Sequence, residues 1–187
     1  MLTKEDLLTC TKTPHMNDIS LRLYIDFAES YLLSRTFHYE FLDGSSIDLK
    51  FTEWGIYHML SIQHIDRKIN SNTFFQKVKD GLSFASFESD ISKKKRFKKQ
   101  KKRITMFACV YNTLTNGTMF YLPSGQVQNT ARVKADYISY MKLINIAHTG
   151  TTYNGVNIGI RKCEDVYIPL TVLISANSNV EEYIMNP

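Results

Sequence analysis

The stretch VNIGIRKCEDVYIPLTVLIS, residues 156–175, decides the fold. Apolar residues alternate with polar or small ones in VNIGIRK, and VYIPLTVLIS is a run of mostly apolar and β-branched residues, which is typical of strands. The mostly charged residues 161–165 between these segments predict a tight turn. We therefore expect two antiparallel strands joined by a hairpin.

Segments further upstream have the same two-residue period. TMFYLP, residues 118–123, and VKADYISYMKLINI, residues 133–146, follow Asn116-Gly117, where helical spacing ends. Together with the first pair they predict an antiparallel sheet of about four strands over residues 116–176. FHYEFLDGSSIDLKF, residues 37–51, alternates on both sides of DGSS and predicts a separate N-terminal β-hairpin.

Much of the remaining chain has helical spacing. Helices are predicted over residues 19–35 and 52–65, from Asn72 to about Gly81, and as one continuous helix over residues 93–114, with a linker over 82–92. The predicted fold class is α+β, with N-terminal helices and a hairpin packed on a C-terminal antiparallel sheet.

Length and composition indicate a folded protein. With 187 residues, of which 43% are hydrophobic, the chain fits a single domain over 1–187, made of a helical segment (1–36), a hairpin with helices (37–115) and the sheet (116–176). Cys10, Cys109 and Cys163 are far apart, so we expect neither a disulfide framework nor a zinc site. The sequence shows no secretion signal and no membrane span, so a cytoplasmic location and no membrane partner are expected.

One segment accounts for the basic character of the chain. Nine of the eleven residues from Lys93 to Arg103, here called the basic strip, are Lys or Arg. The chain has 23 Lys and Arg against 18 Asp and Glu, and setting aside these nine leaves 14 against 18, a net charge of −4. A mildly acidic body with one concentrated cationic segment predicts local contact with a polyanion.

Nucleic acid is the partner that the basic strip favours, because Lys and Arg that neutralise phosphates release counterions. A solvated helix face, a nuclear-import signal and a membrane-surface contact are the alternatives. Arg161, at the end of a predicted strand, has a guanidinium suited to phosphate but is also an ordinary turn residue. The predicted nucleic-acid contacts are Lys93, Lys94, Lys95, Arg96, Lys98, Lys99, Lys101, Lys102, Arg103 and Arg161.

Common enzyme signatures are missing from the sequence. It contains no phosphate-binding G-x-x-x-x-G-K-[ST], no G-x-G-x-x-G, no H-E-x-x-H and no G-x-S-x-G. His58 is a candidate general acid or base, Lys134 is a candidate phosphate stabiliser, and Thr171 is a polar residue in an otherwise apolar strand that could face a cleft; each is also compatible with an ordinary packing or surface role. No metal ligands and no cofactor are expected.

Three segments carry a resemblance to a known family. LKFTEWGIYHMLSIQHI, KADYISYMKLI and VNIGIRKCEDVYIPLTVLI, in this order, resemble the phage-associated branch of the barnase/EndoU/colicin/RelE-like nucleases. That family has a hairpin, a helix with a His-Leu-Leu-Gly-like motif, and a sheet with Lys-Ala-Asp-Tyr-like and Pro-x-Thr-like strands. Residues 37–175 would be covered, with His58, Lys134 and Thr171 at the motif positions. Ser61 stands where the motif has Gly, and the basic strip is not a feature of the family.

The resemblance implies a small metal-independent ribonuclease, often a toxin of phages or mobile elements, that binds RNA across its sheet. The implied chemistry is attack of the 2′-hydroxyl on the adjacent phosphate, with His58 as base or acid, Lys134 holding the phosphate oxygens and Thr171 donating a hydrogen bond. RNA is accordingly favoured over DNA as a partner.

Two other functions remain open at this point. A non-catalytic nucleic-acid-binding module would use the basic strip while His58 is structural. A phage or host-defence interaction protein, such as an inhibitor, would use the strip against an acidic or nucleic-acid-loaded protein, and a neutralising protein partner would fit the toxin interpretation.

Overall fold

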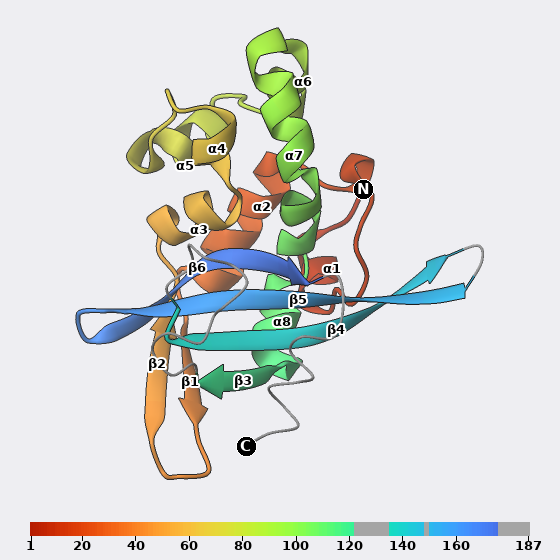
Figure 1. Cartoon of the computed structure of the whole chain (residues 1–187). Coiled ribbons are helices and arrows are strands. Elements are labelled where there is room, and N and C mark those ends of the chain that lie inside the picture. Colours follow the sequence, from red (N-terminus) through yellow and green to blue (C-terminus); the bar gives the residue numbers. More distant parts are fainter. Residues whose placement is uncertain (122–134, 148–149, 176–187) are drawn as a thin grey trace.

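A six-stranded sheet with the strand order β1-β2-β6-β5-β4-β3 forms one layer of the protein. The computed structural model describes residues 1–121, 135–147 and 150–175 (Figure 1). The strands are β1 (Thr36–Glu40), β2 (Ser46–Lys50), β3 (Thr118–Tyr121), β4 (Tyr137–Ala147), β5 (Gly150–Cys163) and β6 (Val166–Ser175).

The predicted hairpin of residues 156–175 is confirmed as β5 and β6. The two strands are antiparallel, and their last pair is Cys163 with Val166. Glu164 in the turn has a φ of 55°, a left-handed conformation that lets the chain reverse within two residues. A register shift after Gly159 marks a β-bulge. β4 lengthens this ladder on one side, and β3 completes that edge.

The N-terminal hairpin belongs to the same sheet, which the sequence did not predict. β1 and β2 pair as expected, but β2 also lies parallel to β6, with Leu49 opposite Tyr167. The sheet is therefore mixed and has six strands where about four antiparallel ones were predicted. Ile47 and Leu49 are buried, and a two-stranded hairpin cannot by itself cover such an apolar face.

Helices pack against the sheet: α8 passes behind β4 and β5, and α6 and α7 extend away from the sheet toward the top of Figure 1. The helical elements are α1 (Lys4–Leu8), η1 (Met16–Asp18), α2 (Leu21–Phe27), the π-helical η2 (Ala28–Leu32), α3 (Glu53–Met59), α4 (Ile62–Ile65), α5 (Ser71–Lys79), α6 (Phe84–Ser89), α7 (Ile91–Phe107) and α8 (Val110–Asn116). Within the described residues, no helix is long and apolar enough to span a bilayer.

Several predicted helices have different boundaries. The helix predicted over 52–65 is interrupted at Ser61, whose φ of 59° is incompatible with a continuous helix. The continuous helix predicted over 93–114 is two helices, α7 and α8, that meet around Cys109. The linker predicted over 82–92 contains α6, and Asn70 rather than Asn72 caps α5 by accepting a hydrogen bond from the Thr73 amide.

The core lies between the helices and the sheet. Tyr24 of α2 packs edge-to-face on Phe107 at the end of α7, with ring centroids 4.9 Å apart, and its hydroxyl donates to the Ile104 carbonyl. Gly55 brings α3 close to β6, because a Cβ at this position would lie 2.8 Å from the Pro169 carbonyl oxygen. These contacts join α2 to α7 and hold α3 against the sheet.

Candidate nucleic-acid interface

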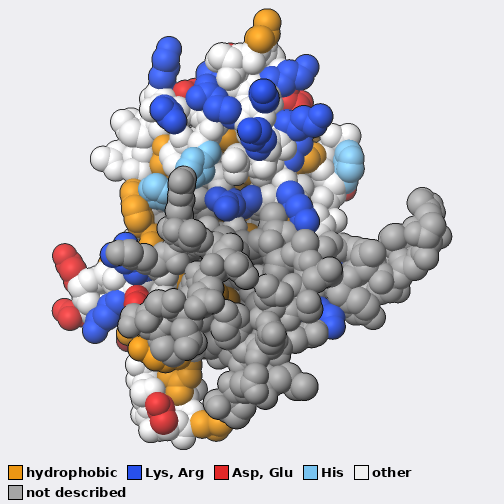
Figure 2. Space-filling model, in the orientation of Figure 1, with side chains coloured by type: hydrophobic (Ala, Val, Ile, Leu, Met, Phe, Trp, Pro, Cys, Tyr) orange, Lys and Arg blue, Asp and Glu red, His pale blue; other side chains and the backbone are white. Residues whose placement is uncertain are grey.

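The basic strip lies on α7, as its sequence predicted. Asp90 caps the helix by accepting hydrogen bonds from the amide and the hydroxyl of Ser92, and these bonds, together with Lys93, lower the pKa of Asp90 to about 2. Lys and Arg are good helix formers, so the strip supports the helix that this cap begins. Figure 2 shows Lys and Arg side chains gathered over the upper half of the molecule, around α7.

Phe97 anchors the cationic half of α7. Its side chain is 1% exposed and packs against Phe84 and Phe87 of α6, with centroid distances of 5.7 Å to each. This single apolar residue within the strip gives the helix an inner face. The basic residues near that face therefore lie close to other parts of the protein, whereas those on the opposite side of the helix face solvent.

Three residues of the strip have partners within the protein. Lys93 lies 2.9 Å from carboxylate oxygens of both Asp66 and Asp90. Lys101 lies 2.6 Å from Glu88 and also 5.2 Å from the centroid of the Phe97 ring. Both lysines therefore help to hold α7 against α4 and α6.

Arg103 is the third such residue. Its Nη1 donates to the Ser61 hydroxyl over 2.9 Å, and its burial lowers the pKa of the guanidinium. Because the guanidinium is engaged between α7 and the break between α3 and α4, Arg103 contributes to the packing of the helices.

Five lysines form the outward face of α7. They are exposed, and their side chains make no hydrogen bond or ion pair with any residue in the described part of the chain. Successive helical residues turn by about 100°, so these five lie within a sector of about 140° and span about 12 Å of helix. We call them the outer lysine row: Lys94, Lys95, Lys98, Lys99 and Lys102. Arg96 is half-buried and lies beside the row.

The outer lysine row is unfavourable for the isolated helix. Like charges three or four residues apart destabilise a helix by about 0.2–0.5 kcal/mol per pair, and the row contains several such pairs. No acidic residue lies between Ile91 and Arg103 to offset them. A row of about 12 Å matches roughly three to four phosphates along one nucleic-acid strand, which would remove this repulsion.

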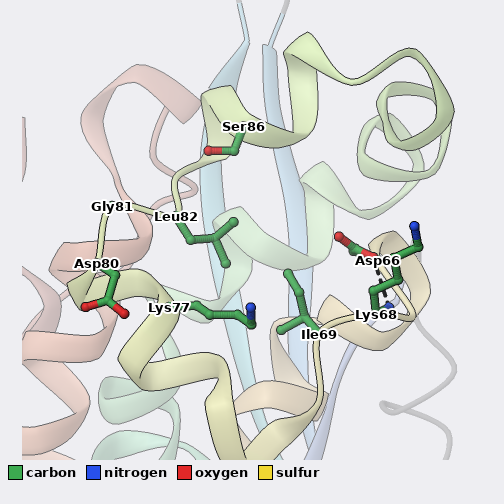
Figure 3. A pocket seen from close by; sticks show the side chains of 8 residues that line it. All are labelled: Asp66, Lys68, Ile69, Lys77, Asp80, Gly81, Leu82 and Ser86. Carbon is green, nitrogen blue, oxygen red and sulfur yellow. Dashed lines mark hydrogen bonds between the residues drawn. The ribbon is translucent and has the colours of Figure 1, made fainter.

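The pocket beside Asp66 does not extend the cationic surface. It has a volume of about 440 Å³ and lies between the α4–α5 connection, the end of α5 and the start of α6 (Figure 3). Its lining includes two basic side chains, Lys68 and Lys77, and two acidic ones, Asp66 and Asp80. This balance of charge gives the pocket no preference for an anion.

His58, the predicted acid or base, is half-buried near the C-terminal end of α3. Its ring lies 4.3 Å from that of Trp54, one turn earlier, and Trp54 is 43% exposed. Burial, and to a smaller extent the nearby His64, lower the pKa of His58. The imidazole is thus neutral near pH 7, and its nitrogens make no hydrogen bond within the described part of the protein.

The structure does not test whether the three predicted catalytic residues meet, because one of them is not among the described residues. Thr171 lies in β6 opposite Gly159 and is 8% exposed. Lys134 lies outside the described residues. Arg161 is exposed at the end of β5, on a different element from the outer lysine row. The convergence of His58, Lys134 and Thr171 stays a prediction.

Some contacts of the site could not be found by sequence reasoning. The acidic partners of Lys93 and Lys101 lie up to 27 residues away and belong to no motif. The Trp54–His58 pair does have a local signal, since residues four apart share a helix face. Among residues 1–121, 135–147 and 150–175, no three His, Cys, Asp or Glu side chains lie close enough together to hold a metal ion.

Comparisons with protein-family models, with curated proteins and with solved structures found no match to this chain.

Proposed function

We propose that this protein binds nucleic acid through the phosphate backbone and that the outer lysine row of α7 is its contact surface. The observation that carries the proposal is the contrast within the basic strip. Lys93, Lys101 and Arg103 have partners in the protein, whereas the five lysines of the row project from a rigidly anchored helix without any described acidic partner.

The proposed binding is independent of base sequence. Ammonium groups on phosphates supply affinity and position, whereas sequence is read by contacts to base edges. RNA is the first ligand to test, because the nuclease resemblance implies it, and DNA of the same sequence should be tested beside it.

Fluorescence anisotropy with a labelled single-stranded RNA tests the proposal. Replacing Lys94, Lys98 and Lys102 by Gln removes three of the five lysines of the row, each four residues from the next, and RNA affinity should fall at least tenfold. A matched control replaces Lys12, Lys50 and Lys77, exposed lysines outside α7, and removes the same number of charges. Equal losses in both triple variants would mean that only net charge matters, and the proposed surface would be wrong.

A second candidate function is metal-independent cleavage of RNA at His58. It is favoured by the neutral imidazole of His58 beside the partly exposed Trp54 ring, on which an unpaired base could stack. His58 would accept the proton of the 2′-hydroxyl as its oxygen attacks the adjacent phosphorus and the bond to the 5′-oxygen breaks, and the departing 5′-oxygen would take a proton from water. Lys134 would hold the phosphate oxygens and Thr171 would donate a hydrogen bond to them.

Incubation of RNA with the protein in EDTA tests the second function. Cleavage should disappear in His58→Ala and Lys134→Ala, and it should persist in the control His64→Ala, which changes an exposed imidazole on the neighbouring helix. RNA that stays intact over a long incubation, while it binds with salt-sensitive affinity, would exclude cleavage and leave the binding function.

A further inference from the structure

Cys10 and Cys109 meet although 99 residues separate them in the sequence. Their Sγ atoms lie 3.3 Å apart. Cys10 follows α1, and Cys109 lies at the junction of α7 and α8. A disulfide has an S–S distance of about 2.05 Å, so the two sulfurs would have to approach by only about 1.3 Å.

Neighbouring polar contacts hold the two thiols in place. The Lys12 carbonyl accepts from Cys10 Sγ at 3.1 Å and from Cys109 Sγ at 3.6 Å. Asn112 of α8 donates through Nδ2 to the Cys10 carbonyl at 3.2 Å. The segment that carries Cys10 is therefore hydrogen-bonded both to Cys109 and to Asn112. These bonds keep the two sulfurs close together without a covalent bond.

The two thiols differ in access and in acidity. Cys10 is half-buried, whereas Cys109 is fully buried. The hydrogen bond between them lowers the pKa of Cys10 and, together with burial, raises the pKa of Cys109. The thiolate is the reacting form of cysteine, so Cys10, with its lowered pKa, is the more reactive thiol. It is also the more accessible one, so a reagent from solution reaches it first.

We propose that Cys10 and Cys109 are a site of reversible oxidation that reacts with small disulfides such as oxidised glutathione. The Cys10 thiolate attacks one sulfur of the reagent, the S–S bond of the reagent breaks, and one glutathione thiolate leaves. Cys109 then loses its proton to that thiolate and attacks the Cys10 sulfur, which releases the second glutathione as a thiolate that takes a proton from water. Two protein thiols become one disulfide, and one oxidised glutathione becomes two reduced molecules.

The cross-link has a structural consequence. It joins the N-terminal segment to the junction of α7 and α8 and closes a loop of about one hundred residues, which restricts the unfolded chain strongly. The oxidised protein should therefore melt at a higher temperature than the reduced protein, and dithiothreitol should reverse the change. The outer lysine row ends seven residues before Cys109, so nucleic-acid binding is not needed for this reaction and does not enter its test.

Peptide mapping of the native chain tests the proposal. After incubation with oxidised glutathione, the mass should fall by two hydrogens, and a peptide pair linked through Cys10 and Cys109 should appear and vanish on reduction. Cys163→Ser should form the same link, since Cys163 lies at the end of β5, and Cys10→Ser should not form it.

Other products would overturn the proposal. A stable glutathione adduct on Cys10 with Cys109 still free would show that Cys109 cannot reach the adduct. A link through Cys163, or no reaction at all, would show that the 3.3 Å contact does not lead to oxidation. These measurements use the native chain, so they stand even if a substituted chain fails to fold.

Discussion

Arg103 donates a hydrogen bond to the hydroxyl of Ser61, 2.9 Å away, and Ser61 has a φ of 59°. A residue of the basic strip thus binds the position at which α3 and α4 separate. The left-handed conformation favours glycine. Here a serine occupies it, and its side chain supplies a contact that glycine lacks.

Substitutions of Ser61 should separate the effect of its hydrogen bond to Arg103 from the effect of its left-handed backbone. Ser61→Ala loses the bond to a partly buried guanidinium and keeps the strained backbone, so the free energy of unfolding should fall by about 1.5–3 kcal/mol. Ser61→Gly loses the same bond but relieves the backbone, so its loss should be about 1 kcal/mol smaller. Urea denaturation measures both. A Gly variant more stable than the native chain would contradict a stabilising role for the hydrogen bond.

Gly55→Ala should destabilise the protein although alanine favours helices. The gain in helix propensity is about 1 kcal/mol, but the new Cβ would lie 2.8 Å from the Pro169 carbonyl, and overpacking typically costs about 1–3 kcal/mol. We expect a net loss of about 1 kcal/mol, measured by urea denaturation. A stabilised variant would show that α3 can move away from β6 without cost.

The salt dependence of RNA binding should report the number of lysines in contact. If the outer lysine row neutralises three to four phosphates of a single strand, the slope of log affinity against log salt is about −2 to −3. Lys94, Lys98 and Lys102 changed to Gln should reduce its magnitude by about 1 to 2. Anisotropy titrations at several salt concentrations measure the slope, and an unchanged slope in the triple variant would contradict contact through the row.

The titration of His58 should occur below its ordinary pKa of 6.5, because burial and then His64 disfavour the imidazolium. His64→Gln should raise the pKa of His58 only in part, since burial is the larger cause. NMR titration of the ring protons measures both. A His58 pKa at or above 6.5 in the native chain would contradict the environment described for this ring.

Stability should follow the same shift in pKa. The folded chain binds the His58 proton less readily than the unfolded chain does, so this residue contributes stability that is complete above about pH 6.5 and is lost as the pH falls below it. His58→Gln should therefore lose less stability than the native chain between about pH 7 and about pH 5. Thermal melts across this interval provide the comparison.

The strands could be predicted because their signal is local. The two-residue period of residues 156–175 and 37–51 is present in consecutive side chains, and both hairpins formed where it occurs. The parallel contact of Leu49 with Tyr167 has no such signal, since it joins residues more than one hundred positions apart. The six-stranded sheet therefore could not be derived from the separate hairpins.

The candidate interface was predicted as a segment but not as a surface. The charge of residues 93–103 and their helical spacing are properties of the sequence. Which lysines face solvent depended on Phe97 packing against α6 and on the distant carboxylates of Asp66 and Glu88. The helix break at Ser61 was missed because a non-glycine residue in the left-handed region is set by its tertiary contacts.

The sequence by itself determined the α+β class, the two hairpins and a cationic helix, because hydrophobic period, turn residues and charge act between neighbours along the chain. Only the tertiary structure decided that the hairpins share one sheet, that five lysine side chains of the strip have no partner among the described residues, and that Cys10 meets Cys109. Those outcomes depend on contacts between residues that are far apart in the sequence. Such contacts form only when the whole core packs.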